Sequence, residues 1–155
     1  MKALILYVSI HHGNTKKVAM AMAEVLNAKL AKPWEIKPEE LAEYDLIGFG
    51  SGIYYWKHHR ALFKLVEGLP EMKGKKAFIF STAGIDVPFI NHRKLRNALR
   101  KKGFEILGEF SCRGWDTNGW LEKMGGINKG HPDEKDLERA RRFAEEVMNL
   151  REKYL

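Results

Sequence analysis

The sequence predicts an α/β fold in which a parallel β-sheet carries helices on both faces. Short apolar runs of strand length alternate with longer amphipathic stretches of helix length along the 155 residues. Every serine and threonine hydroxyl follows shortly after one of these apolar runs. A chain of this length is expected to form one domain, residues 1–155, with a core of its own.

The elements follow one another as strand, helix, strand, with turn residues between them. The expected strands cover residues 3–8, about 34–36, 45–50, 76–81 and 105–111. The expected helices cover about residues 15–30, 39–43, 60–67, 91–102 and a last stretch that starts at Pro132. Glycines end the helices at 60–67 and 91–102, at Gly68 and Gly103. A long glycine-rich loop, residues 113–131, precedes the last helix.

The first strand leads into a polar loop, residues 9–15, with the sequence SIHHGNT. The helix after this loop has Lys16 and Lys17 in its first turn and no acidic residue, although a helix dipole disfavours cations at that end. Backbone N–H groups at a helix start bind anions well, and the loop adds hydroxyl groups. The segment therefore predicts a site for a phosphate group.

The positions of the hydroxyl groups indicate where the rest of that site lies. In a parallel sheet the carboxyl ends of the strands meet at one edge, and ligands bind in the crevice there. The residues concerned are Ser9, Thr15, Ser51, Ser81, Thr82, Ser111 and Thr117. The alternative is that serine and threonine simply favour loops, but the loops at 32–39 and 68–76 contain neither.

Basic residues gather at three of the expected helix starts, at positions 16–17, 57–60 and 92–94. The other two helices open with acidic residues, as the helix dipole prefers. The formal net charge of the chain is +7. These starts should lie on the same edge as the hydroxyl groups, so we expect a basic rim there. Such a rim favours a partner protein with an acidic docking surface, or a small anionic substrate.

Composition and motifs exclude several other classes. A single cysteine, Cys112, rules out an internal disulfide, is typical of a reducing cytoplasm, and is expected to be a buried strand-end residue rather than a redox group. No apolar stretch has the length of a membrane span. No motif indicates nucleic-acid binding. His58 and His59 are adjacent and without a cysteine or carboxylate cluster, so no metal site is expected, and no catalytic Ser–His–Asp set can be assigned.

Three segments together resemble the flavodoxin family. The loop at 9–15, SxxxGNT after an apolar strand, resembles the phosphate loop of flavodoxins. Residues 44–59, YDLIGFGSGIYYWKHH, are similar to the third-strand segment of flavodoxin-like proteins, including protoporphyrinogen-oxidase-type members. Residues 110–137 resemble a branch of small microbial members. The resemblance implies a three-layer, doubly wound sandwich with a five-stranded parallel sheet in the order 2-1-3-4-5. It also implies bound FMN, used for electron transfer.

The resemblance also implies which residues contact the cofactor. Those matching the phosphate loop are Ser9, Gly13, Asn14 and Thr15. His11 and His12 stand where many members have threonine or serine. An imidazole can also donate a hydrogen bond to phosphate, while plain solvent exposure is the alternative for both.

Three further segments match the surroundings of the flavin ring in the family. They contribute Ser51, Gly52, Ile53, Tyr54 and Tyr55 after the third strand, Ser81, Thr82, Ala83 and Gly84 after the fourth, and Arg113 and Trp115 after the fifth. Tyr54, Tyr55 and Trp56 offer aromatic faces for stacking, with core packing as the alternative for some of them.

Three functions remain open at this level. The first is an FMN-carrying electron shuttle, in which the cofactor supplies the chemistry and no catalytic acid is needed. The second is an FMN-dependent oxidoreductase that acts on a quinone- or porphyrin-like substrate, which the similarity of residues 44–59 favours. The third is a binding module without flavin, for which the sequence offers no specific motif.

Overall fold

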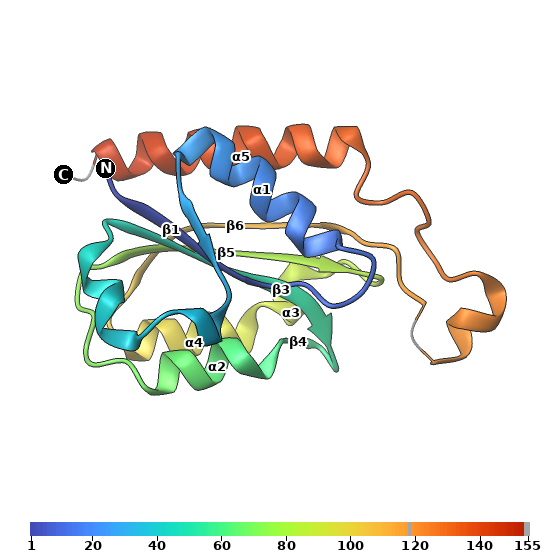
Figure 1. The fold of residues 1–155 in the computed structure, drawn as a ribbon, viewed down its shortest axis with the longest axis horizontal. Helices are drawn as coiled ribbons and strands as arrows, with labels where there is room; N and C mark the ends of the chain where they lie inside the picture. Colours follow the sequence, from blue (N-terminus) through green and yellow to red (C-terminus); the bar gives the residue numbers. More distant parts are fainter. Residues whose placement is uncertain (118, 154–155) are drawn as a thin grey trace.

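Helices α1 (Asn14–Leu26) and α5 (Glu134–Lys153) cover one face of a parallel sheet, and α2 (Arg60–Glu67) and α4 (Arg93–Lys101) cover the other (Figure 1). The computed structural model describes residues 1–117 and 119–153. The parallel strands run in the order β2-β1-β3-β5-β6. Their bounds are Lys29–Ala31, Ala3–Val8, Leu46–Tyr54, Lys76–Ala83 and Glu105–Arg113. When only these five parallel strands are numbered along the chain, their order is the expected 2-1-3-4-5. The three-layer fold predicted from the sequence is therefore confirmed.

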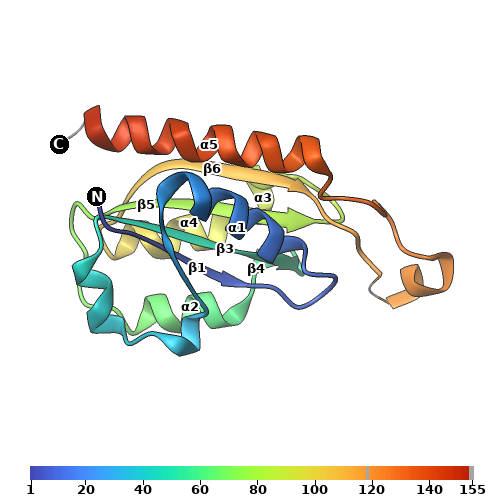
Figure 2. The same ribbon diagram turned by 45° about the horizontal axis from the view of Figure 1, so that its top comes forward.

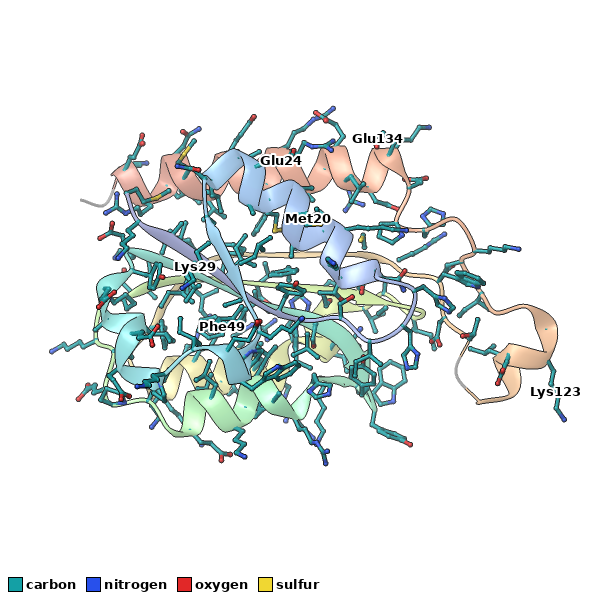
Figure 3. The ribbon with its side chains drawn as sticks, viewed as in Figure 1. Met20, Glu24, Lys29, Phe49, Lys123 and Glu134 are labelled. Atoms are coloured by element: carbon teal, nitrogen blue, oxygen red, sulfur yellow. The ribbon has the colours of Figure 1, made fainter. Side chains whose placement is uncertain are left out.

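The sheet separates two hydrophobic cores, and alternate residues of β1 belong to different ones. Leu4 and Leu6 pack towards α2 and α4, whereas Ile5 and Tyr7 pack towards α1 and α5. Successive side chains of a strand point to opposite faces, which is why an uninterrupted apolar run serves both layers. Figure 3 labels Phe49 within the packed interior, while Met20 and Glu24 lie on the outer side of α1.

The second strand was predicted in the wrong place. It forms at Lys29–Ala31, not at residues 34–36, and pairs with β1. Helix α1 ends earlier than expected, because Asn27 adopts a left-handed conformation with φ 49° and stops it. Pro33 then opens a 3-10 turn, η1 (Pro33–Glu35), which leaves the Trp34 side chain 65% exposed. A second 3-10 segment, η2 (Pro38–Glu43), takes the place of the expected short α-helix.

A β-hairpin replaces the loop expected after the third strand. Strand β3 continues to Tyr54 and turns back into β4 (Lys57–His58), which pairs with it in antiparallel fashion. The two turn residues, Tyr55 and Trp56, both have positive φ values of 50° and 64°. This is the type I′ pattern usually occupied by Asn or Gly, so two bulky aromatic residues hold a strained turn.

The remaining helices differ from expectation at their ends. The helix expected at 91–102 is divided at His92 into α3 (Pro88–Asn91) and α4. The last helix begins at Glu134 rather than Pro132. There Asp133 and Asp136 accept hydrogen bonds from each other's backbone N–H, at 2.9 Å each. Before it, η3 (Gly119–Met124) lies in the long loop that extends from the body of the molecule (Figure 2). Among the described residues, no helix has the length and apolar character needed to cross a membrane.

Candidate functional site

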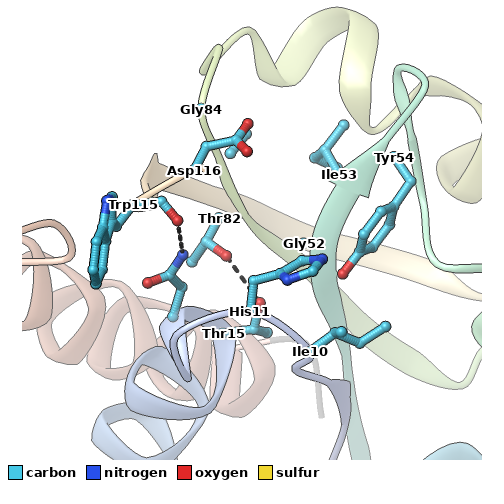
Figure 4. A pocket seen from close by; sticks show the side chains of 13 residues that line it. Ile10, His11, Thr15, Gly52, Ile53, Tyr54, Thr82, Gly84, Trp115 and Asp116 are labelled. Atoms are coloured by element: carbon cyan, nitrogen blue, oxygen red, sulfur yellow. Dashed lines mark hydrogen bonds between the residues drawn. The ribbon is translucent and has the colours of Figure 1, made fainter. Parts of the chain in front are cut away.

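The carboxyl ends of β1, β3, β5 and β6 surround a pocket at one edge of the sheet (Figure 4). Most of the residues predicted to bind a cofactor line it, namely His11, Asn14, Thr15, Gly52, Ile53, Tyr54, Thr82, Ala83, Gly84 and Trp115. Its inner space is about 40 Å³, enough for a small polar group. It adjoins an open hollow of about 140 Å³ that shares Ile53, Ala83 and Gly84 with it and adds Tyr55 and Trp56.

The deep end of the pocket is the loop between β1 and α1. Gly13 precedes the helix with φ 67° and has no side chain with which to cap it, and the first turn contains no acidic residue. The Ser9 hydroxyl accepts a hydrogen bond from the backbone N–H of Lys16 at 3.1 Å. Ser9 is not among the residues that line the pocket. The loop therefore presents the positive end of a helix dipole with no acidic side chain in the first turn of the helix.

Two hydrogen bonds tie this loop to the other strand ends. The hydroxyl groups of Thr15 and Thr82 lie 2.9 Å apart and are buried. The Asn14 side-chain amide donates to the carbonyl oxygen of Trp115 at 2.9 Å. Both contacts appear as dashed lines in Figure 4. The phosphate-loop side chains are thus positioned by residues that come much later in the chain.

The two adjacent histidines have different surroundings. His11 lines the pocket, opposite Tyr54 in Figure 4. His12 is outside the lining: its ring stacks on Trp115 with centroids 3.8 Å apart, and its Nε2 lies 2.9 Å from the Thr117 hydroxyl. Of the two histidines, His11 therefore lies at the pocket, and His12 lies outside its lining.

The hydroxyls of Ser51 and Ser81, expected in the pocket, belong to the interior instead. Ser51 donates to the Gly52 carbonyl oxygen at 2.6 Å and accepts from the His59 backbone at 2.9 Å. Ser81 lies 2.6 Å from Nε2 of His92. Both side chains are fully buried, and both follow the alternation of the strand, which turns Thr82 to the pocket and Ser81 away from it.

Ser81 is the first of four polar side chains that form a hydrogen-bonded row beneath the site, with His92, Glu109 and Arg96. Nδ1 of His92 lies 2.9 Å from a carboxylate oxygen of Glu109. Arg96 donates two hydrogen bonds to the same carboxylate, from Nε at 2.7 Å and from Nη2 at 2.8 Å. Burial acts to raise the pKa of Glu109, but the hydrogen bonds from His92 and Arg96 outweigh it and lower the pKa to about 2. The Ser81 hydroxyl has no exposed surface, so this Ser–His–Glu arrangement supports the strands rather than meeting a substrate.

The histidines at the start of α2 and α4 were expected in the basic rim, and two of them are not there. His58 and His92 are buried, with 1% and 0% exposure. The Nε2 of His58 lies 2.9 Å from the Phe80 carbonyl oxygen. Burial, helped by the neighbouring His92, lowers the pKa of His58 to about 3, so its ring is neutral. His59 caps α2 by accepting from the Ala61 backbone at 3.0 Å.

The aromatic residues at the hairpin differ in their surroundings. Tyr54 lines the pocket, and its pKa is raised by burial and by the charge of Asp116. Tyr55 and Trp56 are 94% and 51% exposed, so neither is a core residue. Arg113 is exposed at the end of β6, outside the pocket lining. Cys112 is buried, as expected, and burial raises its pKa to about 12.

Ile10, Gly114 and Asp116 line the pocket without having been predicted. A Cβ on Gly114 would lie 2.7 Å from the Asn14 amide nitrogen, and one on Gly84 would lie 2.5 Å from a carboxylate oxygen of Asp116. A glycine directly after an expected strand was the signal available for Gly114. The absence of a side chain at Gly84 and Gly114 makes room for Asp116 and Asn14, so these side chains pack closely against the backbone of the pocket wall.

Comparison with known proteins agrees with this geometry. Residues 4–108 match the model of a flavodoxin domain family. The chain is 50% identical over 151 residues to an uncharacterized protein of Methanocaldococcus jannaschii, covering 96% of this chain and 99% of that protein.

Solved structures show the same fold. A flavodoxin from the domain Archaea superposes with a TM-score of 0.72 at 21% identity, covering 98% of this chain and 99% of its own. Oxidised Flavodoxin 2 from Bacillus cereus gives a TM-score of 0.71 at 20% identity, covering 96% and 99%.

Proposed function

Since the chain belongs to the flavodoxin domain family, whose cofactor is FMN, we propose that it is an electron carrier with FMN held at the pocket described above. One observation carries the proposal: the start of α1, which has no acidic residue in its first turn, and the pocket that contains Gly52, Gly84 and Gly114 meet at the carboxyl edge of the sheet. The first suits a phosphate group and the second suits a flat ring. The donor set and the bare backbone therefore fit FMN.

The phosphate belongs at the deep end of the pocket. Thr15 would donate its hydroxyl and Asn14 lies beside it, while the first turn of α1 supplies backbone N–H groups and Lys16 and Lys17 add positive charge. His11 lines the same end and can donate from its ring. Loss of one hydroxyl donor to an ionised acceptor costs about 1.5–3 kcal/mol.

The ring belongs where the pocket opens into the adjoining hollow. Gly52, Ala83 and Gly84 form its backbone walls, and Tyr54 and Tyr55 stand at its mouth. An aromatic residue against a flat ring contributes about 0.5–1.5 kcal/mol beyond area burial. Packing of these aromatic side chains against the flavin ring would account for the strained turn at Tyr55 and Trp56.

FMN, when bound, supplies the one- or two-electron chemistry. The chain itself binds and orients the cofactor, shields part of it from water and sets the charge around it. Lys57 lies in β4 and Arg113 at the end of β6, and Asp116 is the acid in the pocket lining. This excess of cations over acids favours a redox partner with an acidic docking surface. We propose that the partner is a protein in the cytoplasm rather than nucleic acid.

An FMN-dependent oxidoreductase is the second candidate. A quinone- or porphyrin-like substrate needs room beside the cofactor and groups that recognise an anion. A large groove with basic residues lies on the other side of Tyr54 and His59 from the pocket, and this observation favours the candidate.

Titration of the apo-protein with FMN, riboflavin and FAD tests the cofactor site. FMN should bind more tightly than riboflavin, because riboflavin lacks the phosphate. Thr15→Ala should weaken FMN affinity by roughly tenfold or more, whereas Ser111→Ala, a hydroxyl outside the pocket, should not. Riboflavin binding as tight as FMN binding would contradict a phosphate-anchored site.

Electron transfer needs its own measurement. The reduced FMN-loaded protein should transfer electrons to an acidic redox protein, with a rate that falls as salt concentration rises. A rate that is insensitive to salt would argue against the proposed basic docking surface.

A further inference from the structure

A large groove lies outside the cofactor pocket. It runs between the segment that follows β2 and the start of α2, with a volume of about 730 Å³. Figure 2 shows this segment alongside α2. Small-molecule sites in proteins fall at about 300–1,000 Å³, so the groove has the size of a ligand site.

One wall of the groove is apolar and carries an exposed aromatic face. Pro33, Trp34 and Pro38 form this wall, above the buried side chains of Ile36 and Leu65. Trp34 is 65% exposed, because the 3-10 turn that Pro33 opens holds it out of the core. A tryptophan over an apolar floor offers a stacking surface for a flat ring.

The opposite wall is basic. Arg60 and Lys64 are one helical turn apart on α2, both exposed, and the groove lining contains no acidic residue. Neither side chain forms an ion pair with any residue that the structure describes. The nearby Glu35 is outside the lining and accepts from the Lys32 backbone at 2.8 Å. The wall therefore holds two cations available to an anionic group.

His59 adds a neutral donor between the groove and the cofactor pocket. Its Nδ1 accepts from the Ala61 backbone, so the hydrogen of the neutral ring is on Nε2. Burial and the charge of Arg60 lower the pKa of His59, which keeps the ring neutral near pH 7. Its ring meets Tyr54 edge to face at 5.5 Å, and Tyr54 lines the cofactor pocket.

We propose that this groove is a second binding site, which takes a planar aromatic anion such as a bicyclic carboxylate or sulfonate. The ring would stack on Trp34 and the anionic group would lie against Arg60 and Lys64. As the site of a substrate, the groove rests on the proposed function, since it would place that molecule next to the cofactor. Its occupancy can be measured without any redox reaction. An acidic peptide is the competing occupant, and the test separates the two.

Calorimetry on the FMN-loaded protein with 2-naphthalenesulfonate tests the proposal, with the uncharged 2-naphthalenemethanol as the matched ligand. The sulfonate should bind more tightly than the alcohol. Trp34→Ala should weaken its binding roughly three- to tenfold, and Trp34→Phe should restore much of the loss. Lys64→Gln should also weaken it.

The control variants are Phe89→Ala and Lys101→Gln, an exposed aromatic residue and an exposed cation that lie outside the linings of the groove and the cofactor pocket. Both should leave sulfonate affinity unchanged. FMN affinity should be unchanged in Trp34→Ala, so a failure of the groove and a failure of the cofactor site give different results.

Several outcomes would overturn the proposal. Sulfonate binding that survives Trp34→Ala, equal affinity for the alcohol, or displacement of the sulfonate by FMN from the apo-protein would each place the ligand elsewhere. Binding of a poly-glutamate peptide that depends on Trp34, without binding of the sulfonate, would assign the groove to an acidic peptide. Thermal unfolding of each variant confirms that it is folded.

Discussion

His58 should make the protein sensitive to acid well above the pH at which carboxylates protonate. Its ring is buried beneath the hairpin that carries the pocket residue Tyr54, with Nε2 bonded to the Phe80 carbonyl oxygen. Its Nδ1 is also buried and has no hydrogen-bond partner among the described residues. A proton on this ring would be a buried charge beside His92, which is why the folded state resists it.

The magnitude follows from the two pKa values. His58 has a pKa of about 3 in the folded protein against an ordinary value of 6.5. Above pH 6.5 neither state carries the proton, whereas below it only the unfolded state takes one up. The free energy of unfolding should therefore fall by about 1.4 kcal/mol per pH unit as the pH drops from 6.5 towards 3. Between pH 7 and pH 5 the loss is about 2 kcal/mol.

Urea unfolding of the FMN-free protein at pH 7, 6 and 5 measures this pH dependence of the free energy of unfolding. His58→Leu removes the titrating group, so its free energy of unfolding should depend less on pH than that of the parent, by about 1.4 kcal/mol per unit between pH 6 and 5. Its stability at pH 7 should be lower by about 1–3 kcal/mol, because the Phe80 carbonyl oxygen loses its partner.

Leu62→Ala is the matched control, since Leu62 is buried and does not titrate. It should lower stability by about 2–5 kcal/mol at every pH and leave the slope parallel to that of the parent. Identical slopes in the parent and His58→Leu would refute the assignment of a buried, neutral His58.

Other predictions concern the hydrogen-bonded row beneath the site, the rim and the phosphate end. Glu109→Gln should lower the free energy of unfolding at pH 7 by about 2–4 kcal/mol; because the folded pKa of Glu109 is depressed to about 2, this loss should shrink as the pH falls from 4.5 towards 2, as acid unfolding curves would show. The double variant Lys57→Ala, Arg113→Ala should lower the midpoint potential of the bound flavin, more at low salt than at high salt, since removing cations disfavours added negative charge; spectroelectrochemistry measures this, and an unchanged potential at low salt would place both cations away from the ring. His11→Ala should weaken FMN affinity more than His12→Ala does, because only His11 lines the pocket; equal effects of the two in FMN titrations would contradict the different positions of these rings.

Local sequence signals predicted the main elements. Helix α2 was expected at 60–67 and occurs at Arg60–Glu67, because an amphipathic stretch between a polar start and Gly68 carries its own boundaries. The polar loop after β1 was also recognisable, since strand, glycine-containing turn and helix follow one another within a few residues. The alternation of strand and helix patterns determined the fold class, and the loop at 9–15 indicated one end of the pocket.

Tertiary structure decided everything that depends on which distant residue a side chain meets. The three residues of β2 have no strand pattern of their own and become a strand by pairing with β1. His58 and His92 look like rim cations in the sequence, but Phe80 and Glu109, 22 and 17 residues away, turn them into interior groups. The groove beside Trp34 exists because a proline-led turn packs next to α2. Neighbours in the chain set the turns and most helix boundaries, whereas pairing and packing across the sheet set the conformation of β2 and the burial, charge state and partners of the side chains.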